Sequence, residues 1–298
     1  MSGSLDQRRR SPRSDTRKSL LVALLTPLTR EGGVDVAALQ GHVKELLAAE
    51  VDGFFLCGTT GEGPLLDDDE VALVTRAVVS ASEGQSFVTT QVGRPGTATT
   101  VRLLGLALDA GADGVTAVAP YYYALDDAHL EGHFTELLAA AGDAPLFAYT
   151  IPRCAGNDFS PMLVERLADR GLAGIKDSTR SLERHADYLR TATGRSPGSF
   201  AVYMGSDVLA HEALLRGSSG LVSALANVRP DLFVGLRAAV EEGRSEDAVG
   251  VQAEIDAVRE SLSGGGIPGL KAAVAARMAA RGVAYGAAAR PPLGLPAR

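Results

Sequence analysis

The sequence predicts a closed (β/α)8 barrel of the α/β class, with helices appended after the last strand. Short apolar runs alternate with amphipathic helical patterns from Ser19 onward, at roughly 25 to 30 residues per unit. A pattern of helix end, short turn, glycine and apolar strand recurs at Gly53, Gly114, Gly174 and Gly220. Eight such units fit within roughly 220 residues, and this length suits a TIM barrel.

The size of the chain is compatible with this single large domain. It has 298 residues, of which 46% are hydrophobic and 22% are charged, so apolar material for a core is ample. An open doubly wound sheet is the alternative fold. That fold would carry a glycine-rich dinucleotide fingerprint after its first strand, where this chain has Thr26-Pro27.

The first half of the barrel contains four predicted strands, each followed by a helix. The strands are expected at residues 19–25, 53–57, 87–92 and 113–119. Asp35 is the expected N-cap of the first helix, because apolar residues recur at helical spacing after it. The acidic run Asp67–Glu70 opens the second helix, where negative charge favours the positive end of the helix dipole. The third helix ends near Ala110 and the fourth begins near Asp127.

The second half of the barrel repeats the pattern. The strands are expected at residues 145–150, 172–177, 199–204 and 220–225. Helices begin at Ser160-Pro161 and at Pro230, because proline is tolerated in the first turn of a helix.

Further helical patterns follow the eighth strand. They cover residues 246–262 and 270–280, with the stretch Gly264–Pro268 between them. The prediction therefore divides the chain into a disordered tail (1–18), a barrel core (19–228), and a segment (229–298) that holds the last barrel helix and a C-terminal helical extension.

Charge and composition exclude several classes of function. The net charge of −7 argues against a nucleic-acid or anionic-membrane surface. No apolar run reaches the roughly 20 residues that span a bilayer, and the N-terminus lacks the hydrophobic segment of a secretory signal. We therefore expect a cytoplasmic protein.

The cysteines and histidines do not predict a metal site. Cys57 and Cys154 give neither a disulfide framework nor zinc spacing, and Cys57 is expected in the core of its strand. The five histidines show no ligand spacing and are expected at the surface or at helix caps. Neither a metal nor another cofactor is expected.

The stretch Leu172–Ser178 ends a buried strand with a lysine, Lys176. A charged amine in apolar surroundings is destabilised, so such a lysine either finds a partner or becomes a neutral nucleophile. The structural interpretation is a snorkelling or ion-paired side chain at a strand end. The functional interpretation is a Schiff-base residue that attacks a keto group.

Active sites of such barrels lie where the carboxyl ends of the strands converge. The side chains expected at this rim are Thr59, Thr60, Tyr122, Tyr149, Lys176, Asp207 and Val222. Tyr149 and Lys176 end neighbouring strands, about 4.8 Å apart, so the phenol can contact the amine and relay protons.

The glycine-rich turn after the second strand, Gly58–Gly63, faces this lysine across the predicted mouth. Its backbone N–H groups at Gly58 to Gly61 and a threonine hydroxyl can bind a carboxylate, although such a stretch is also an ordinary tight turn. A 2-oxo acid would occupy both halves of this site. The tyrosines at 121–123 either belong to this site or represent plain packing or an interface patch.

The order of these motifs resembles the dihydrodipicolinate synthase/N-acetylneuraminate lyase family. The similar motifs are Gly58–Glu62, Pro120–Tyr122, Tyr149–Pro152, Gly174–Asp177, Gly220–Ser223 and Lys271 followed by Arg290–Leu293. The resemblance runs from about Leu21 to Leu293.

The resemblance implies metal-free class I chemistry on pyruvate or another 2-oxo acid. It implies that Lys176 forms the Schiff base, that Tyr149 relays protons and that Thr60 holds the pyruvate carboxylate. It also implies that Thr59 links to Tyr149. Tyr122 would reach the neighbouring subunit's site, so a homotetramer, as a dimer of dimers, is expected.

One departure from the family pattern bears on the substrate. Dihydrodipicolinate synthases resemble this stretch but carry an arginine where Cys154 stands, and Arg153 lies one place earlier. The triple tyrosine and the stretch Gly205–Asp207 are more similar to the 2-keto-3-deoxy-sugar-acid aldolases, in which Asp207 would accept hydrogen bonds from substrate hydroxyls.

The sequence therefore favours a Schiff-base aldolase or lyase that joins or separates pyruvate and an aldehyde. Dihydrodipicolinate synthase and N-acetylneuraminate lyase are the alternatives within the family. A 2-oxo acid dehydratase shares the same Schiff base. A non-catalytic 2-oxo acid binding protein is the fourth possibility, although Lys176, Tyr149 and Thr60 show no defect.

Overall fold

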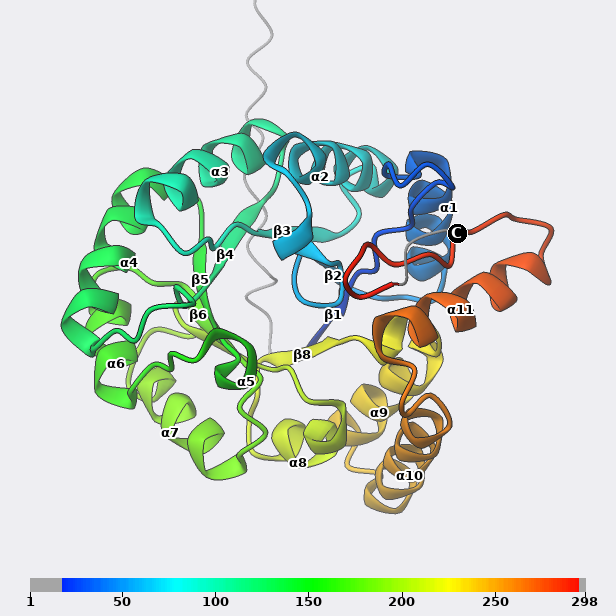
Figure 1. The fold of residues 1–298 in the computed structure, drawn as a ribbon. Helices are drawn as coiled ribbons and strands as arrows, with labels where there is room; N and C mark the ends of the chain where they lie inside the picture. Colours follow the sequence, from blue (N-terminus) through cyan, green and yellow to red (C-terminus); the bar gives the residue numbers. More distant parts are fainter. Residues whose placement is uncertain (1–17, 295–298) are drawn as a thin grey trace, which may run out of the picture.

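The strands close into a barrel in which each is parallel to its neighbours in sequence, and the first pairs with the last (Figure 1). This computed structural model describes residues 18–294. The strands are β1 (Ser19–Ala23), β2 (Gly53–Leu56), β3 (Phe87–Gln91), β4 (Gly114–Val118), β5 (Leu146–Thr150), β6 (Gly174–Asp177), β7 (Ala201–Met204) and β8 (Gly220–Ser223). The predicted (β/α)8 fold is confirmed, and the open doubly wound sheet is excluded because the sheet has no free edge.

Helices connect the strands and form the outer ring of Figure 1. They are α1 (Val36–Ala48), α2 (Asp68–Ser82), α3 (Thr97–Asp109), α4 (Asp127–Ala141), α5 (Pro152–Ala155), α6 (Pro161–Asp169), α7 (Leu182–Ala192), α8 (Ala210–Leu215), α9 (Pro230–Glu241), α10 (Ser245–Ser261) and α11 (Gly266–Ala279). Short 3-10 turns are η1 (Gly63–Leu65), η2 (Asp207–Leu209) and η3 (Leu225–Asn227). The helices α10 and α11 lie outside the ring, as the predicted C-terminal extension requires.

The predicted helix starts are confirmed by their capping contacts. The side chain of Asp35 accepts a hydrogen bond from the Ala38 N–H at 3.0 Å. Asp67 and Glu70 form a reciprocal capping box at the start of α2. Ser160 accepts a hydrogen bond from the Leu163 N–H at 3.0 Å at the start of α6.

One helical prediction was wrong, and one short helix was missed. The stretch Gly264–Pro268 is only partly a linker, because α11 begins at Gly266 and contains Pro268 in its first turn. The N–H groups in the first turn of a helix have no intrahelical partner, so proline, which lacks an N–H, costs little there. The short helix α5 was not predicted, since four residues give no periodicity.

The predicted surface location was wrong for three of the histidines. His42, His133 and His185 are buried. His185 lies between the carboxylate of Asp177, 3.0 Å from Nδ1, and the hydroxyl of Ser218, 2.6 Å from Nε2. Polar partners on both ring nitrogens allow a histidine to be buried at low cost.

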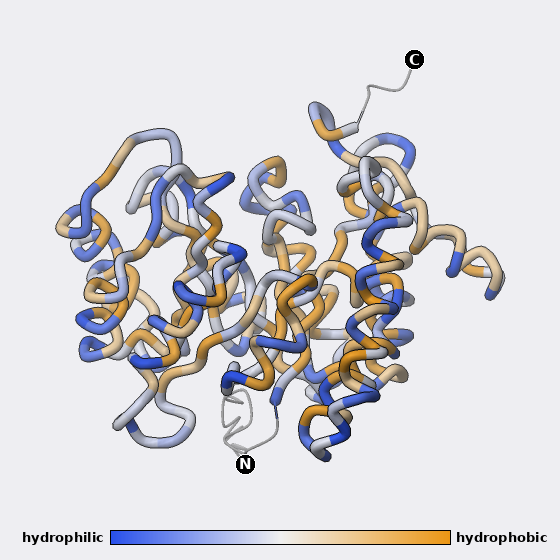
Figure 2. The backbone as a smooth tube through the Cα atoms, turned by 90° about the horizontal axis from the view of Figure 1, so that it is seen from below, coloured by the Kyte–Doolittle hydropathy of each residue, from blue (hydrophilic) through white to orange (hydrophobic). Residues whose placement is uncertain are grey.

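The apolar core follows the strands. In Figure 2 the apolar parts of the chain gather at the centre, whereas the outer helices alternate between apolar and polar residues. Nearly every strand residue is buried, as expected for a parallel sheet covered by helices on the outside and side chains within. Within residues 18–294, no helix combines the length and the apolar character that crossing a bilayer requires.

Candidate active site

Lys176 lies on β6, opposite Tyr149 of β5 and Tyr203 of β7 in the strand register. Only 6% of the residue is exposed. Its Nζ atom lies 3.7 Å from the centre of the Phe55 ring and 4.1 Å from the centre of the Tyr149 ring. The amine therefore sits inside the barrel, between two aromatic rings from β2 and β5.

This environment changes the titration of the amine. Burial lowers the pKa of Lys176 from 10.5 to about 7, while the negative charge of Asp207 acts in the opposite direction. The faces of the two rings also attract the protonated form, but removal of water outweighs them. A substantial fraction of the amine is therefore neutral, and hence nucleophilic, at neutral pH.

The phenol of Tyr149 is held by hydroxyl groups. Its oxygen lies 3.2 Å from the Thr59 hydroxyl oxygen, and Ser178 provides a second side-chain hydrogen bond. Burial raises the pKa of the Tyr149 phenol above its usual value of 10, although both hydroxyls favour the phenolate. Tyr149 is therefore a protonated group at neutral pH, in contact with the amine of Lys176.

The turn after β2 is shaped around this pair of side chains. A Cβ atom at Gly58 would lie 2.2 Å from Cε1 of Phe55, so only glycine leaves room for the ring beneath the amine. The Thr26 hydroxyl donates to the carbonyl of Gly61 at 2.8 Å and fixes the far side of the turn. Thr60 lies half-buried between these two glycines.

The predicted position of Cys57 needs a correction. Its side chain is buried, but the residue follows β2 and has a left-handed backbone with φ of 52°. It therefore belongs to the turn rather than to the strand core.

Two more predicted residues converge on the amine. Val222 is buried on β8 and lines the same interior space as Lys176 and Phe55. Asp207 begins η2, after β7, and burial raises its pKa to about 6, against the effect of hydrogen bonds from the Ser223 side chain and the Leu225 N–H. A carboxyl group with a raised pKa and an amine with a lowered pKa thus influence each other at the mouth of the barrel.

The remaining predicted residues lie further out. Tyr122 is 87% exposed, has a left-handed φ of 86°, and packs edge-to-face on Tyr123. Arg153 is exposed on α5, and its charge lowers the pKa of Tyr149. Cys154 beside it is an exposed free thiol.

Three residues of the site were given no role in it by the sequence analysis, although two of them lie in stretches that it named. Phe55 provides an aromatic face for the amine, and Ser178 bonds to the Tyr149 phenol. A Cβ atom at Gly205 would lie 2.2 Å from the Ser178 hydroxyl and 3.1 Å from Cε of Lys176. The position of Ser178, two residues after the lysine, was the one available signal, because it also leaves the strand at the rim.

The fold and this site define a class of enzyme. A buried amine with a pKa near 7, beside a hydrogen-bonded phenol at the carboxyl end of a (β/α)8 barrel, is the apparatus of lysine Schiff-base chemistry. Within residues 18–294 there is no group of three or more His, Cys, Asp or Glu side chains that could hold a metal ion.

The family follows from comparison with known proteins. Residues 16–297 match the model of the Dihydrodipicolinate synthetase family, and the chain belongs to this family. It is 38% identical over 256 residues to a DapA-like lyase of Halobacterium salinarum, covering 85% of this chain and 82% of that protein. It is 34% identical over 229 residues to the 4-hydroxy-tetrahydrodipicolinate synthase of Thiobacillus denitrificans, covering 76% of each chain.

Solved structures agree with this assignment. YagE, a prophage protein of E. coli K12 solved in complex with pyruvate, superposes with a TM-score of 0.84 at 28% identity over 92% of each chain. A variant of the 2-keto-3-deoxygluconate aldolase of Sulfolobus solfataricus gives a TM-score of 0.82 at 26% identity, over 93% of this chain and 90% of that one. The protein is therefore a class I aldolase or lyase of a family that acts on pyruvate.

Proposed function

We propose that this enzyme cleaves or forms the carbon–carbon bond between pyruvate and an aldehyde in a 2-keto-3-deoxy sugar acid, with Lys176 as the Schiff-base residue. The observation that carries the proposal is the Lys176 amine, which has a pKa of about 7 and contacts the Tyr149 ring. Its neutral form adds to the keto carbon, and loss of water gives an iminium that withdraws electrons from the adjacent bonds.

Because its pKa is raised, the Tyr149 phenol carries its proton at the start of the reaction. The protonated phenol therefore acts first as a donor and only afterwards as an acceptor. The phenol first donates its proton to the departing carbinolamine hydroxyl, which leaves as water. The resulting phenolate, stabilised by Thr59 and Ser178, then accepts the proton of the substrate hydroxyl as the carbon–carbon bond breaks. The aldehyde leaves, and protonation and hydrolysis of the enamine release pyruvate and the free lysine.

The other residues bind substrate in this proposal. Thr60 and the backbone of Gly58 to Gly61 bind the carboxylate of pyruvate, because oriented N–H groups and a hydroxyl in a turn favour an anion. Val222 packs against the pyruvate methyl end. Asp207 accepts hydrogen bonds from the sugar hydroxyls.

Arg153 is the residue that bears on the choice of substrate. It is exposed beside the free thiol of Cys154, and it acts on the Tyr149 phenol from the rim. A carboxylate of a second substrate could meet it there, as 4-hydroxy-tetrahydrodipicolinate synthesis requires, so that activity is the second candidate. The likeness to 2-keto-3-deoxygluconate aldolase supports the sugar acid.

Tyr122 carries the proposal of quaternary structure. A large aromatic side chain that is 87% exposed and held in a left-handed conformation is costly in a monomer. We propose that it enters the neighbouring subunit's site within a homotetramer, in the cytoplasm. Sedimentation analysis of wild type and Tyr122→Ala tests this, and a monomeric wild type would refute it.

A panel of substrates tests the reaction. Pyruvate release should be fastest from a 2-keto-3-deoxy sugar acid, with the aldehyde appearing in equal amount. Release of water with retention of the whole carbon chain would instead identify a dehydratase. Faster turnover with the aldehyde substrate of 4-hydroxy-tetrahydrodipicolinate synthase, or with N-acetylneuraminate, would reassign the substrate. Saturable binding without any product would identify a binding protein.

A further inference from the structure

The turn after β2 includes backbone conformations that are unfavourable for the residues that adopt them. Cys57, directly before the turn, and Glu62, within it, have left-handed φ angles of 52° and 59°. This backbone conformation is unfavourable for any residue other than glycine, and it persists only where its surroundings impose it. Contacts outside the turn must therefore supply the constraint.

Glu62 receives that constraint from the C-terminal part of the chain. Only 1% of Glu62 is exposed, and its carboxylate forms an ion pair with Lys271 of α11, which is fully buried. The second carboxylate oxygen accepts a hydrogen bond from the Arg290 N–H at 2.7 Å. The N–H of Glu62 in turn donates to the carbonyl of Thr59 at 3.2 Å, so the contact reaches the threonine that touches Tyr149.

The two C-terminal partners are themselves fixed in place. Lys271 donates a second hydrogen bond to the carbonyl of Ala288 at 2.7 Å. The Arg290 guanidinium binds both carboxylate oxygens of Glu70, at 2.5 and 2.7 Å, and the carbonyl of Leu65 at 2.9 Å. In Figure 1 this segment, coloured red, returns from α11 past α1 to the side of the barrel formed by β1 and β2.

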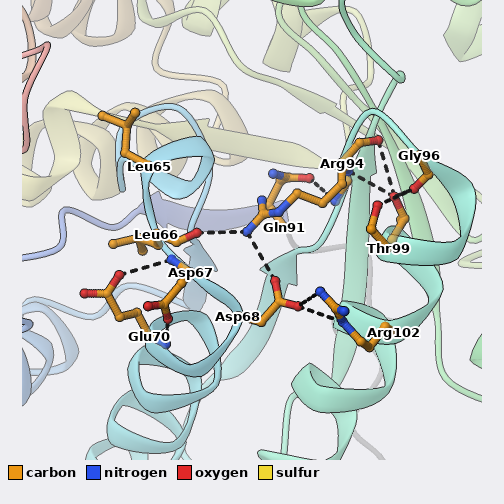
Figure 3. Close-up of polar contacts among 12 residues, drawn as sticks. Leu65, Leu66, Asp67, Asp68, Glu70, Gln91, Arg94, Gly96, Thr99 and Arg102 are labelled. Carbon is orange, nitrogen blue, oxygen red and sulfur yellow. Dashed lines mark hydrogen bonds and ion pairs between the residues drawn. The ribbon is translucent and has the colours of Figure 1, made fainter.

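The segment that follows the turn is also held from the opposite side. Arg94, in the loop after β3, donates to the carbonyl of Leu66 at 3.2 Å and lies 4.0 Å from the carboxylate of Asp68 (Figure 3). Asp68 pairs further with Arg102 of α3. The C-terminal segment therefore contacts the turn itself, and the β3–α3 loop holds the residues that follow the turn.

We propose that Lys271 and Arg290 are positioning residues for pyruvate, which hold the turn in the shape that binds the carboxylate. This inference rests on the proposed function. A buried ion pair is a poor source of stability, because an apolar pair of similar volume stabilises as much or more. The pair does, however, fix one arrangement of the Glu62 backbone. The C-terminal extension is thus part of the substrate-binding machinery, although neither side chain touches the substrate.

Trapping of pyruvate by borohydride measures this directly. The adduct on Lys176 is counted by mass spectrometry as pyruvate is varied, which separates half-saturation from the maximal trapping rate. Lys271→Met and Arg290→Ala should raise the half-saturation concentration about 10- to 100-fold, since small displacements of binding groups carry penalties of this size. The maximal rate should change by less than about threefold, because Lys176 and Tyr149 are untouched.

Arg277→Met is the matched control. Arg277 also ties α11 to the barrel, through Glu45 at 3.4 Å and the carbonyl of Asn227 at 3.1 Å, but these contacts do not reach the turn. It should lower stability while leaving the half-saturation concentration within about twofold of wild type. Arg290→Ala keeps the backbone N–H that binds Glu62 but removes the guanidinium contacts to Glu70 and Leu65 that hold this backbone in place. The Arg290 side chain is partly exposed, so this variant decides the outcome even where Lys271→Met fails to fold.

The outcomes separate the inference from the function on which it rests. A wild type that traps no pyruvate would refute the proposed function and the inference together. A wild type that traps pyruvate, with Lys271→Met and Arg290→Ala matching its half-saturation concentration, would refute the inference alone. An equal rise in Arg277→Met would also refute it, because general loosening of α11 would then explain the effect.

Discussion

Two buried lysines of this chain have opposite surroundings. Lys176, on β6, has the faces of Phe55 and Tyr149 around its amine. Lys271, on α11, has the carboxylate of Glu62 and a backbone carbonyl. Burial is the largest cause of a lowered pKa in both, but Glu62 opposes it at Lys271 through a hydrogen bond and its charge.

The difference shows that burial alone does not make a lysine a nucleophile. At Lys176 the amine faces two aromatic rings, and burial lowers its pKa to about 7 despite the charge of Asp207. At Lys271 the Glu62 carboxylate pairs with the amine and favours its charged form, so this lysine joins two distant segments of the chain. The same residue type therefore supports chemistry in one region and geometry in the other.

The largest expected effect is the loss of catalysis when Lys176, but not another lysine, is replaced. Lys176→Arg should lower pyruvate release at least ~10⁴-fold, because a guanidinium stays protonated and cannot form an iminium. Lys44→Arg is the control, since Lys44 is exposed on α1 and should behave as wild type. Borohydride trapping followed by peptide mass spectrometry checks the site. A pyruvate adduct on Lys271 would contradict the assignment of chemistry to Lys176 and of a structural role to Lys271.

Stability should respond to the two lysines with opposite sign. The folded-state pKa of Lys176 is about 7 against 10.5 unfolded, so the unfolded chain binds more protons between these values, and wild-type stability rises with pH across that window. Lys176→Met removes this penalty and should raise the free energy of unfolding at pH 7 by roughly 2–4 kcal/mol. The gain should shrink toward pH 10.

Lys271→Met should instead lower the free energy of unfolding by about 3–5 kcal/mol, because the Glu62 carboxylate stays buried without its partner. Urea unfolding of both variants at pH 7 and pH 9 provides the measurement. Equal signs for the two substitutions would show that their surroundings matter less than burial.

Most of the fold and the inner part of the site could be predicted from the sequence. Strand periodicity and recurring glycines identify the barrel, and the position of Lys176 at a strand end then places it at the rim. The same reasoning places side chains near the carboxyl ends of the other strands at this rim, which is why Tyr149 and Val222 were predicted.

Contacts between distant segments could not be predicted in the same way. Phe55 belongs to an ordinary apolar strand, and nothing local shows that its ring covers the amine. Glu62 and Lys271 are 209 positions apart by their numbers in the sequence, and only the folded chain brings them together. Burial of His185 depends on Asp177 at the end of β6 and on Ser218 in the loop before β8.

The next largest effect is a loss of kcat when the phenol of Tyr149, which contacts Lys176, is removed. Tyr149→Phe should lower kcat about 10²- to 10³-fold, because a positioned proton donor contributes on this scale. Thr59→Val keeps the phenol and removes one of its hydroxyl partners, so a smaller loss of about 10-fold is expected. Steady-state kinetics with the best substrate of the panel measures both. A Thr59→Val enzyme slower than Tyr149→Phe would contradict the proposed relay.

The smallest effect is a shift in the titration of Lys176. The charge of Asp207 raises the pKa of this amine, and Asp207, with a pKa of about 6, is still largely ionised where the amine titrates. Asp207→Asn should therefore lower the apparent pKa of the acidic limb of the pyruvate-trapping rate, by less than about one unit. Pyruvate alone is the probe, so loss of sugar binding does not interfere.

Asp126→Asn is the control, because Asp126 is an exposed carboxylate at the N-cap of α4, and it should leave the acidic limb unchanged. No shift in Asp207→Asn would mean that the carboxyl group is already neutral beside the amine, and that burial sets the pKa of Lys176 without it.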